Sequence, residues 1–332
     1  MPNLSAVLRR FPGQRILTIG DVILDSYWWG DASRLSPEAP VPVVRMRSST
    51  VRPGGAANTA ANLAALGAAP LLVGLVGNDR AAEELQGALL QCGVAVDSLI
   101  SENARPTTTK TRIIASHQQI VRVDEEDTAP LPRETEERAL QAIAEGLERS
   151  SAVVVSDYAK GFLTPSLLHF VTAAAGRAGK RVFMDPKGAD YTRYQGCFLM
   201  KPNRLELSIL TGLPARNHQE TLAAGNRLSA LMPGAMILVT EGADGMTLFA
   251  GSGPIEHLAP APRQVYDVTG AGDTVLATLS LAISAGASYR DAMELAAEAA
   301  AIAIGTMGTA TVTLPQLERA LHERMQPGAS AG

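Results

Sequence analysis

Short aliphatic runs alternate with longer helical patterns along most of this 332-residue chain. Runs such as Leu71–Val76 and Ala152–Ser156 are almost entirely apolar, as strands are when both faces of a parallel sheet are covered. The alternation predicts βα units that build an α/β fold with a doubly wound, mostly parallel sheet flanked by helices. The expected strands are Arg15–Ile19, Leu71–Val76, Ala152–Ser156, Arg181–Met184, Phe198–Met200, Met236–Thr240 and Met246–Ala250.

Two stretches depart from this alternation. Gly30–Arg52 carries three prolines among alternating apolar residues, and Thr107–Val123 is rich in Thr and Val without a helical period. Both can be loops, but we favour their pairing into a small, discontinuous β-sheet lid. The expected organisation is an α/β core of residues 1–29, 53–105 and 124–325, a lid and dimerisation element of residues 30–52 and 106–123, and a flexible tail of residues 326–332.

Charge and composition exclude several classes of protein. The 29 Lys and Arg residues against 33 Asp and Glu residues leave no broad cationic face for nucleic acid or an acidic membrane. The first 15 residues lack the apolar core of a signal peptide, and no run reaches the length of a membrane span. Two cysteines are too few for a disulfide framework. We expect a cytoplasmic protein without a nucleic-acid or membrane partner.

Polar segments follow four of the expected strands. One such segment is more often a turn or a helix cap than a site, because Asp, Asn and Gly are the residues that turns require. The carboxyl ends of parallel strands meet at one edge, however, so four segments there predict a single cleft. Its lysines and oxygen ligands suit a phosphate-rich ligand with a divalent cation. The segments are Asp157–Gly161, Asp185–Gly188, Lys201–Glu206 and Glu241–Gly245.

The most informative segment is Asp267–Thr274, which leads into an apolar helix. Gly270 and Gly272 allow a tight turn whose backbone N–H groups point at one anion. Asp273 then lies beside that anion, where a carboxylate can take a proton from an attacking hydroxyl. The alternative is that Asp273 or Thr274 only caps the helix, and these residues by themselves leave both interpretations open.

Two further turns precede or follow expected elements near the N-terminus. Pro53–Asn58 opens an Ala-rich helix, where small residues let a polyol approach and Asn58 offers a donor and an acceptor. Gly20–Asp25 follows the first strand with carboxylates suited to sugar hydroxyls. The G-x-x-x-x-G-K-[ST] phosphate-binding motif is missing, and no G-x-G-x-x-G motif follows the first strand. The absence of the second motif, which binds dinucleotides, disfavours a dehydrogenase. The five histidines lack metal-ligand spacing.

Taken together, Gly-Ala-Gly-Asp at 270–273, Gly-Gly-x-x-Asn at 54–58, the Gly20–Asp25 spacing and Asn203-x-x-Glu206 resemble the ribokinase-like (pfkB) carbohydrate kinases over the whole chain. Within that family, four stretches are similar to heptose 7-phosphate kinases of lipopolysaccharide biosynthesis. The short Gly-Gly-to-Asn spacing and Val268-Thr269 before the Gly-Ala-Gly-Asp motif depart from ribokinase itself and are typical of the heptose branch. The four stretches are Ser33–Val44, Ser156–Gly161, Asp185–Gly188 and Asp267–Thr274.

The resemblance implies a role for each matching residue. Asp273 is the expected catalytic base, and the amides of Gly270, Ala271 and Gly272 are expected to hold the transferred phosphate. Asn203 and Glu206 are expected to order Mg²⁺ through water. The nucleotide is expected beside Asn203, Arg204, Leu205, Glu206, Thr240, Gly242 and Gly245, and the sugar beside Asp25, Gly54, Gly55, Asn58 and Asp185.

A sugar that already carries a phosphate also needs cations. Lys160 and Lys187 are the first candidates by charge and position, followed by Arg34, Arg112 and Arg122 of the lid. The resemblance implies ATP- and Mg²⁺-dependent phosphorylation of the anomeric C1 hydroxyl of D-glycero-D-manno-heptose 7-phosphate, on the route to ADP-heptose. It also implies a homodimer and, because the chain ends soon after residue 325, a stand-alone kinase. The alternatives left open are another ribokinase-like sugar or sugar-phosphate kinase and a non-catalytic ligand-sensing module.

Overall fold

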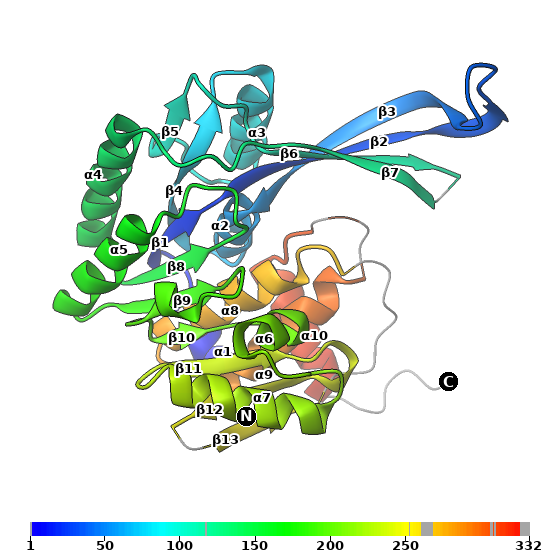
Figure 1. The fold of residues 1–332 in the computed structure, drawn as a ribbon. Coiled ribbons are helices and arrows are strands. Elements are labelled where there is room, and N and C mark those ends of the chain that lie inside the picture. The colour runs from blue at the N-terminus through cyan, green and yellow to red at the C-terminus, as the bar shows by residue number, and fades with distance from the viewer. Residues whose placement is uncertain are drawn as a thin grey trace, which may run out of the picture.

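The computed structural model describes residues 2–116, 118–251, 253–259, 268–305, 308 and 310–325. A nine-stranded sheet forms the centre of the molecule, with the order β13-β12-β11-β10-β9-β8-β1-β4-β5 (Figure 1). The strands from β11 to β5 run parallel, and β12 and β13 are antiparallel additions at one edge. The bounds are β1 Arg15–Gly20, β4 Ala69–Gly77, β5 Leu99–Glu102, β8 Ala152–Ser156, β9 Arg181–Asp185, β10 Leu199–Met200, β11 Met236–Thr240, β12 Met246–Ala250 and β13 Gly253–Leu258.

Helices cover both faces of this sheet. One face packs on the cluster that includes α1, α8, α9 and α10, and the other on α4, α5, α6 and α7. Alternate residues of one strand serve the two cores: Val154 of β8 faces the first, and Val153 and Val155 face the second. The helices are α1 Pro2–Leu8, α2 Ala56–Ala65, α3 Arg80–Gln91, α4 Arg133–Arg149, α5 Pro165–Arg177, α6 Arg204–Thr211, α7 His218–Leu231, α8 Ala271–Ser284, α9 Tyr289–Ala303 and α10 Leu314–Met325, with short 3-10 turns at Tyr191–Tyr194 and Gly242–Asp244.

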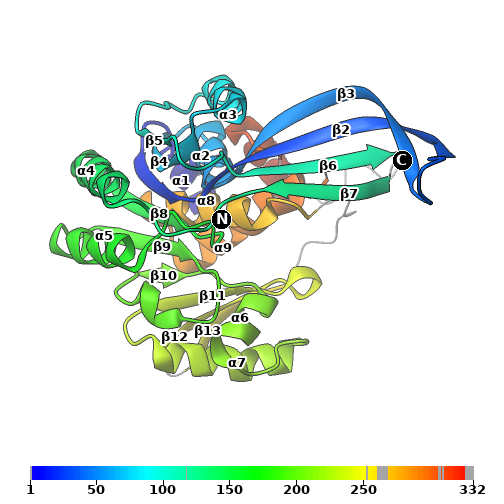
Figure 2. The same ribbon diagram turned by 45° about the horizontal axis from the view of Figure 1, so that its top comes forward.

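A second, four-stranded sheet extends from this core as an arm (Figures 1 and 2). Its order is β3-β2-β6-β7, with bounds β2 Val22–Leu35, β3 Pro42–Gly55, β6 Thr109–Ala115 and β7 Gln118–Glu125. The two stretches expected to be extended therefore do pair with each other. The sheet starts earlier than expected, because β2 begins directly after β1 and β3 continues to the start of α2.

The point where the strand order reverses fixes the location of the site. The chain leaves β1 toward β4 on one side and later returns to β8 on the other, so β1 and β8 flank a topological switch point. Ligands of doubly wound sheets bind beyond the carboxyl ends of the strands at such a point. Gly20 ends β1 and Asp157 follows β8, so both lie at this edge.

All seven strands expected from the aliphatic runs are present, most with ends shifted by a residue or two. The sequence did not predict α1, β5 or β13, each of which is short or lies at an edge of the fold. Among the helices of the described residues, none combines the length and apolar character needed to cross a membrane. The expected tail at 326–332 and Asp267 lie outside the described residues.

Candidate active site

Asp273 lies in the first turn of α8 and is almost completely buried. Gly270 caps this helix with a φ of 79°, a left-handed conformation that glycine adopts without strain. Gly270, not Asp273, occupies the N-cap position, and the Asp273 carboxylate accepts hydrogen bonds from Asn58 and Tyr158, so the interpretation as a mere helix cap does not describe it. Burial raises the pKa of Asp273 to about 7; hydrogen bonds from Asn58 and Tyr158 lower the pKa, while the nearby Asp185 raises it further.

A chain of side-chain hydrogen bonds orients the amide that holds Asp273. The Thr274 hydroxyl donates to Asn62 Oδ1 at 3.2 Å, and Asn62 Nδ2 donates to Asn58 Oδ1 at 3.1 Å. This fixes the amide of Asn58 so that its Nδ2 donates to Asp273 Oδ2 at 2.8 Å. The described contacts of Asn58 are thus within the protein, and its expected contact with a sugar stays a prediction.

Tyr158 forms a hydrogen bond with the other carboxylate oxygen of Asp273. Its hydroxyl donates to Asp273 Oδ1 at 3.0 Å, and burial together with Asp273 raises the pKa of Tyr158 well above its ordinary value. Asp21 holds the loop that carries Tyr158, because its carboxylate accepts from the backbone N–H groups of Tyr158, Lys160 and Phe162. Asp21 is therefore a buried support for the loop, whereas Asp25 lines the cavity.

Asp25 on β2 faces the cavity and pairs with Arg112 on β6, whose Nη1 donates to Oδ1 at 2.6 Å. Burial raises the pKa of Asp25, and Arg112 opposes that shift. Gly54 on β3 lies directly behind this carboxylate: a Cβ at position 54 would be 2.5 Å from Asp25 Oδ2. The absence of a side chain at Gly54 thus leaves room for Asp25.

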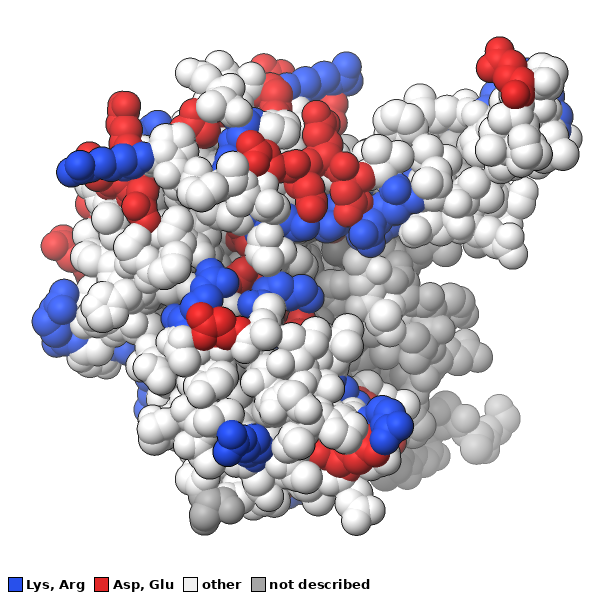
Figure 3. Space-filling view, viewed as in Figure 1, with Lys and Arg blue, Asp and Glu red and all other residues white. Residues whose placement is uncertain are grey.

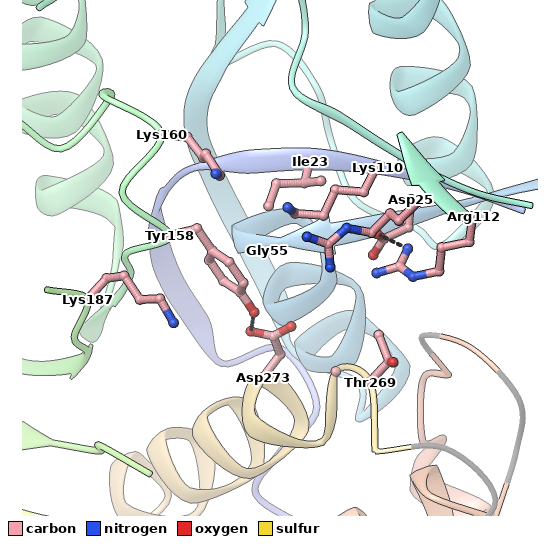
Figure 4. Close-up of a pocket in the computed structure, with 12 residues that line it drawn as sticks. Ile23, Asp25, Gly55, Lys110, Arg112, Tyr158, Lys160, Lys187, Thr269 and Asp273 are labelled. Carbon is pink, nitrogen blue, oxygen red and sulfur yellow. Dashed lines mark hydrogen bonds and ion pairs between the residues drawn. The ribbon is translucent and has the colours of Figure 1, made fainter. Parts of the chain in front are cut away.

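A cavity of about 280 Å³ lies between the second sheet and the start of α8. Lysine and arginine side chains gather in this hollowed region, where the arm leaves the rest of the molecule (Figure 3). In the close-up, Lys187 lies across the cavity from Arg112, with Tyr158 and Asp273 between them (Figure 4). Five cations surround the cavity against the two carboxylates of Asp25 and Asp273, although the whole chain is mildly acidic. The cations are Lys110, Arg112, Arg122, Lys160 and Lys187.

The cations on the side of the second sheet are held by acidic residues behind them. Lys110 Nζ and Arg122 Nε contact the carboxylate of Asp124 at 3.0 and 2.8 Å, and Lys160 Nζ contacts Glu126 at 2.6 Å. These pairs fix the ammonium and guanidinium groups beside the cavity and leave their remaining donors for an anion.

Lys201, which the sequence analysis did not select, is buried beside the Gly270–Gly272 turn. A Cβ at Gly272 would be 3.4 Å from its Nζ, and the same Nζ pairs with Asp185 at 3.0 Å. Burial lowers the pKa of Lys201, but Asp185, Glu206 and Asp273 outweigh this effect and raise it above the ordinary value. A charged ammonium group therefore adjoins the N-terminus of α8.

Asn203 and Glu206 form a capping box at the start of α6. Asn203 Oδ1 accepts from the Glu206 N–H at 2.9 Å, and Glu206 Oε2 accepts from the Asn203 N–H at 3.0 Å. Glu206 Oε1 also accepts from Lys187 Nζ at 3.0 Å. These oxygens fit Mg²⁺ through bound water, because direct ligation would break the box or the ion pair.

The expected nucleotide residues meet at one edge beyond β10 and β11. Asn203 forms an isolated parallel β-bridge with Thr240. Arg204 of α6 contacts Glu241 and Asp244, which lie in the turn that follows β11. Gly242 and Gly245 of that turn have positive φ, and Leu205 is exposed. Eight expected site residues line the cavity, and the others except Arg34 surround it or lie at this edge; the eight are Asp25, Gly55, Arg112, Arg122, Lys160, Lys187, Gly270 and Asp273. Arg34 is exposed toward the far end of β2 and does not line the cavity.

Comparison with known proteins identifies the family of this chain. The model of the pfkB family of carbohydrate kinases matches residues 14–317. "Bifunctional protein HldE" of Methylobacillus flagellatus is 44% identical over 93% of this chain, and that of Geobacter metallireducens is 43% identical over 94%. The chain spans 63% and 64% of the length of these two relatives.

Solved structures share the fold at lower identity. Arabidopsis thaliana ribokinase, complexed with ribose and ATP, superposes with a TM-score of 0.74 at 24% identity, covering 93% of this chain and 99% of that one. The tetrameric inhibited form of Escherichia coli phosphofructokinase-2 gives a TM-score of 0.77 at 19% identity, covering 95% and 100%. With the family model matching most of the chain, this protein belongs to the pfkB family of carbohydrate kinases.

Proposed function

We propose that this kinase transfers the γ-phosphoryl group of ATP to the anomeric C1 hydroxyl of D-glycero-D-manno-heptose 7-phosphate, giving the 1,7-bisphosphate on the route to ADP-heptose. The observation that carries the proposal is a cavity with five cations that ends at a buried carboxylate with a raised pKa. A neutral sugar does not require so much positive charge. The sequence identity of 44% and 43% to two proteins named HldE supports the placement of this chain in the heptose branch of the family.

The phosphate that the sugar already carries is assigned to the side of the second sheet. Three cations lie there: Lys110 and Arg122, which pair with Asp124, and Lys160, which pairs with Glu126. These ion pairs hold the cations in place, so they present preorganised donors to a dianion. Asp25, fixed by Arg112, is placed to accept from hydroxyls of the sugar ring. This arrangement spans the sugar between a phosphate end and the Asp273 end.

At the other end, Asp273 acts as general base. Its carboxylate takes the proton of the anomeric hydroxyl as that oxygen forms a bond to the γ-phosphorus, and the bond from phosphorus to the β–γ bridging oxygen breaks to release ADP. A pKa of about 7 matches this task, since the group is then substantially ionised and still basic near neutral pH. Asn58 and Tyr158 position the carboxylate.

The transferred phosphoryl group is assigned to the N-terminus of α8. Backbone N–H groups of Gly270, Ala271 and Gly272 lie at a positive helix end, and the buried ammonium group of Lys201 adjoins them. Lys187 is the cavity cation on the α6 side, where it pairs with Glu206, and is assigned to the ATP phosphates. The edge formed by Asn203–Glu206 and Thr240–Gly245 is assigned to the nucleotide.

Asn203 and Glu206 are the residues that would hold Mg²⁺ through water, which is the oxygen-ligand chemistry that this ion prefers. When bound, Mg²⁺ neutralises charge on the phosphates. The protein's own contribution is to keep these oxygens in place through the capping box, so the ion need not order them.

A panel of plain and phosphorylated sugars tests the proposal. ATP consumption is measured with heptose 7-phosphate, fructose 6-phosphate, ribose and heptose, and the product is identified by ³¹P NMR. We expect heptose 7-phosphate to give the highest kcat/KM and a new phosphorus resonance coupled to the anomeric proton. A higher kcat/KM with an unphosphorylated sugar, or phosphate on another carbon, would contradict it.

We also propose that the kinase is a homodimer through the second sheet. The register places Trp28, Ile113 and Val121 side by side across β2, β6 and β7, on the face opposite Asp25, Lys110 and Arg112. Trp28 and Val121 are exposed, and Val123 extends the same face. An apolar row on a projecting sheet is typical of a surface that a partner covers.

A further inference from the structure

Two histidines and a glutamate meet at the edge of the large sheet, outside the cavity that holds Asp273. His218 is the first residue of α7, Glu241 follows β11, and His257 lies on β13 opposite Thr247 of β12. One ligand atom from each of the three lies within 4.8 Å of the others. The histidines have no metal-ligand spacing in the sequence, and only the antiparallel addition of β12 and β13 brings them together.

The distances are close to those of a tetrahedral site. His218 Nδ1 lies 3.0 Å from Glu241 Oε2, and His257 Nδ1 lies 3.9 Å from Glu241 Oε1. Around Zn²⁺, bonds of about 2.0–2.1 Å place neighbouring ligand atoms about 3.3 Å apart. Both distances lie within about 1 Å of that value, the first to Oε2 and the second to Oε1 of the Glu241 carboxylate. The two imidazole rings are in contact, with centroids 4.4 Å apart.

Burial and exposure also fit a site that is open on one side. The Glu241 side chain is fully buried, whereas those of His218 and His257 are about 40% exposed. An ion can therefore enter from solvent past the imidazoles and keep water at a remaining position. Thr247 donates a hydrogen bond to Glu241 Oε1, an outer contact of the kind that orients a metal-binding carboxylate. The same hydroxyl lies 2.9 Å from His257 Nδ1, and an ion ligated by that nitrogen replaces this second contact.

Arg204 is the competing group, since its Nη2 contacts Glu241 Oε2 at 3.0 Å. The same nitrogen contacts Asp244 Oδ2 at 2.6 Å. If an ion takes the oxygen of Glu241, the guanidinium group keeps Asp244 as its partner and is not left as an unpaired charge. Metal binding to Glu241 therefore does not leave the guanidinium group of Arg204 as an unpaired charge, which would be the largest free-energy cost of losing Glu241 as a partner.

We propose that His218, Glu241 and His257 bind a divalent transition-metal ion of the Zn²⁺ type, separately from the Mg²⁺ expected at the phosphates. Imidazole nitrogens select zinc, cobalt, nickel and copper over magnesium, which prefers oxygen. Glu241 belongs to the Thr240–Gly245 turn, and its N–H donates to Gly245 O at 2.8 Å, so a bound ion restrains this turn. The inference concerns the sheet edge itself and does not require the proposed substrate.

The test titrates chelator-treated full-length protein with Co²⁺, in the presence of excess Mg²⁺, and follows the visible d–d absorption of cobalt. We expect one saturable site, displacement of Co²⁺ by Zn²⁺, and a melting temperature that rises with Zn²⁺. His218→Gln and His257→Gln are each expected to weaken binding at least tenfold and to abolish the thermal shift. Thr247→Val is expected to weaken binding about tenfold.

His169→Gln on α5 is the matched control, because His169 is exposed and lies outside the cluster. It is expected to bind Co²⁺ as the wild type does. The proposal is overturned if the wild type gives no one-to-one Co²⁺ spectrum, or if His218→Gln and His257→Gln bind as tightly as His169→Gln. Circular dichroism of each variant establishes that it is folded, so weaker binding can be assigned to the lost ligand.

Discussion

Asp273 couples the chemistry of the site to the stability of the fold. Its folded pKa of about 7 lies above the ordinary value of 3.8, so the folded protein binds the extra proton over the interval between them. Stability contributed by the neutral form is present below about pH 4 and is lost as the pH rises to about 7. The buried charge therefore costs up to about 4 kcal/mol above pH 7, at roughly 1.4 kcal/mol per pH unit.

Asp273→Asn removes both the base and this cost. We expect turnover to fall roughly 100-fold or more while ATP binding is retained. We also expect the melting temperature to exceed that of the wild type at pH 8, with the difference shrinking toward pH 4. Asp97→Asn, at an exposed position, is the control and changes neither quantity. Near wild-type turnover in Asp273→Asn would falsify the assignment of the base.

Tyr158→Phe tests how the base is tuned. Loss of the hydroxyl removes a hydrogen bond to the charged form of Asp273, so the pKa of Asp273 rises. We expect the acid limb of kcat/KM against pH to move upward by roughly one unit, equivalent to about 1.4 kcal/mol. Tyr289→Phe is the control: Tyr289 is exposed at the start of α9, does not line the cavity, and should leave the limb in place. An unmoved limb in Tyr158→Phe contradicts a positioning role.

Residue patterns placed Asp273 at the start of a helix but did not predict its surroundings. The Gly-Ala-Gly turn by itself left the choice between base and helix cap open, and the resemblance to the family selected Asp273 as the expected base. Tyr158 and Lys201 were not selected, although both lie in segments that follow strands, because their importance depends on contacts with Asp273 across the fold. The sequence signal for Lys201 was a lysine directly after a buried strand, which is costly to bury unless carboxylates surround it.

Among the elements, β3 shapes the cavity through Gly54, whose lack of a side chain leaves room for the Asp25 carboxylate. Gly54→Ala places a methyl group 2.5 Å from Asp25 Oδ2 and so displaces a carboxylate fixed by Arg112. We expect the KM for the sugar substrate to rise about tenfold, corresponding to about 1.4 kcal/mol, with the KM for ATP unchanged.

Gly87→Ala in α3 is the matched control, because a Cβ there meets no atom within 4 Å. It should raise the free energy of unfolding by about 0.5–1 kcal/mol through helix propensity and leave both KM values unchanged. If Gly54→Ala alters the KM for ATP and for the sugar equally, then Asp25 does not act on the sugar specifically.

The elements were predicted well where burial on both faces leaves a continuous aliphatic run, as in Ala152–Ser156, whose bounds match β8. Prediction failed at β13, where exposed and half-buried residues alternate irregularly, and at α1, where seven residues give little periodicity. The second sheet was expected from its composition, but its entry into the core was not. Val22–Tyr27 is buried by contacts that no local pattern records.

For the molecule as a whole, the projecting second sheet places charge on one face and an apolar row on the other. Strand pairing keeps directly opposite residues on the same face, so Arg112 and Arg122 lie on the face that lines the cavity. Trp28, Ile113 and Val121 lie on the opposite face. Under the proposed assignments, one set binds the substrate and the other contacts a second copy. Both proposals therefore use the strands β2, β6 and β7.

Val121→Glu tests this arrangement. A carboxylate in the middle of an apolar interface would be buried without a partner, so we expect the dimer to dissociate at micromolar concentration, as measured by size exclusion with light scattering. Ile255→Glu on β13 is the control, because it adds the same charge at a similarly exposed apolar position. β13 is an edge strand of the large sheet and not part of the second sheet, so the dimer should persist. A monomeric wild type, or an unchanged mass in Val121→Glu, excludes this face as the interface. Covering the apolar row is also expected to steady β6 and β7, which carry Lys110 and Arg122. The monomeric variant should therefore bind the sugar phosphate more weakly, with little change in the KM for ATP.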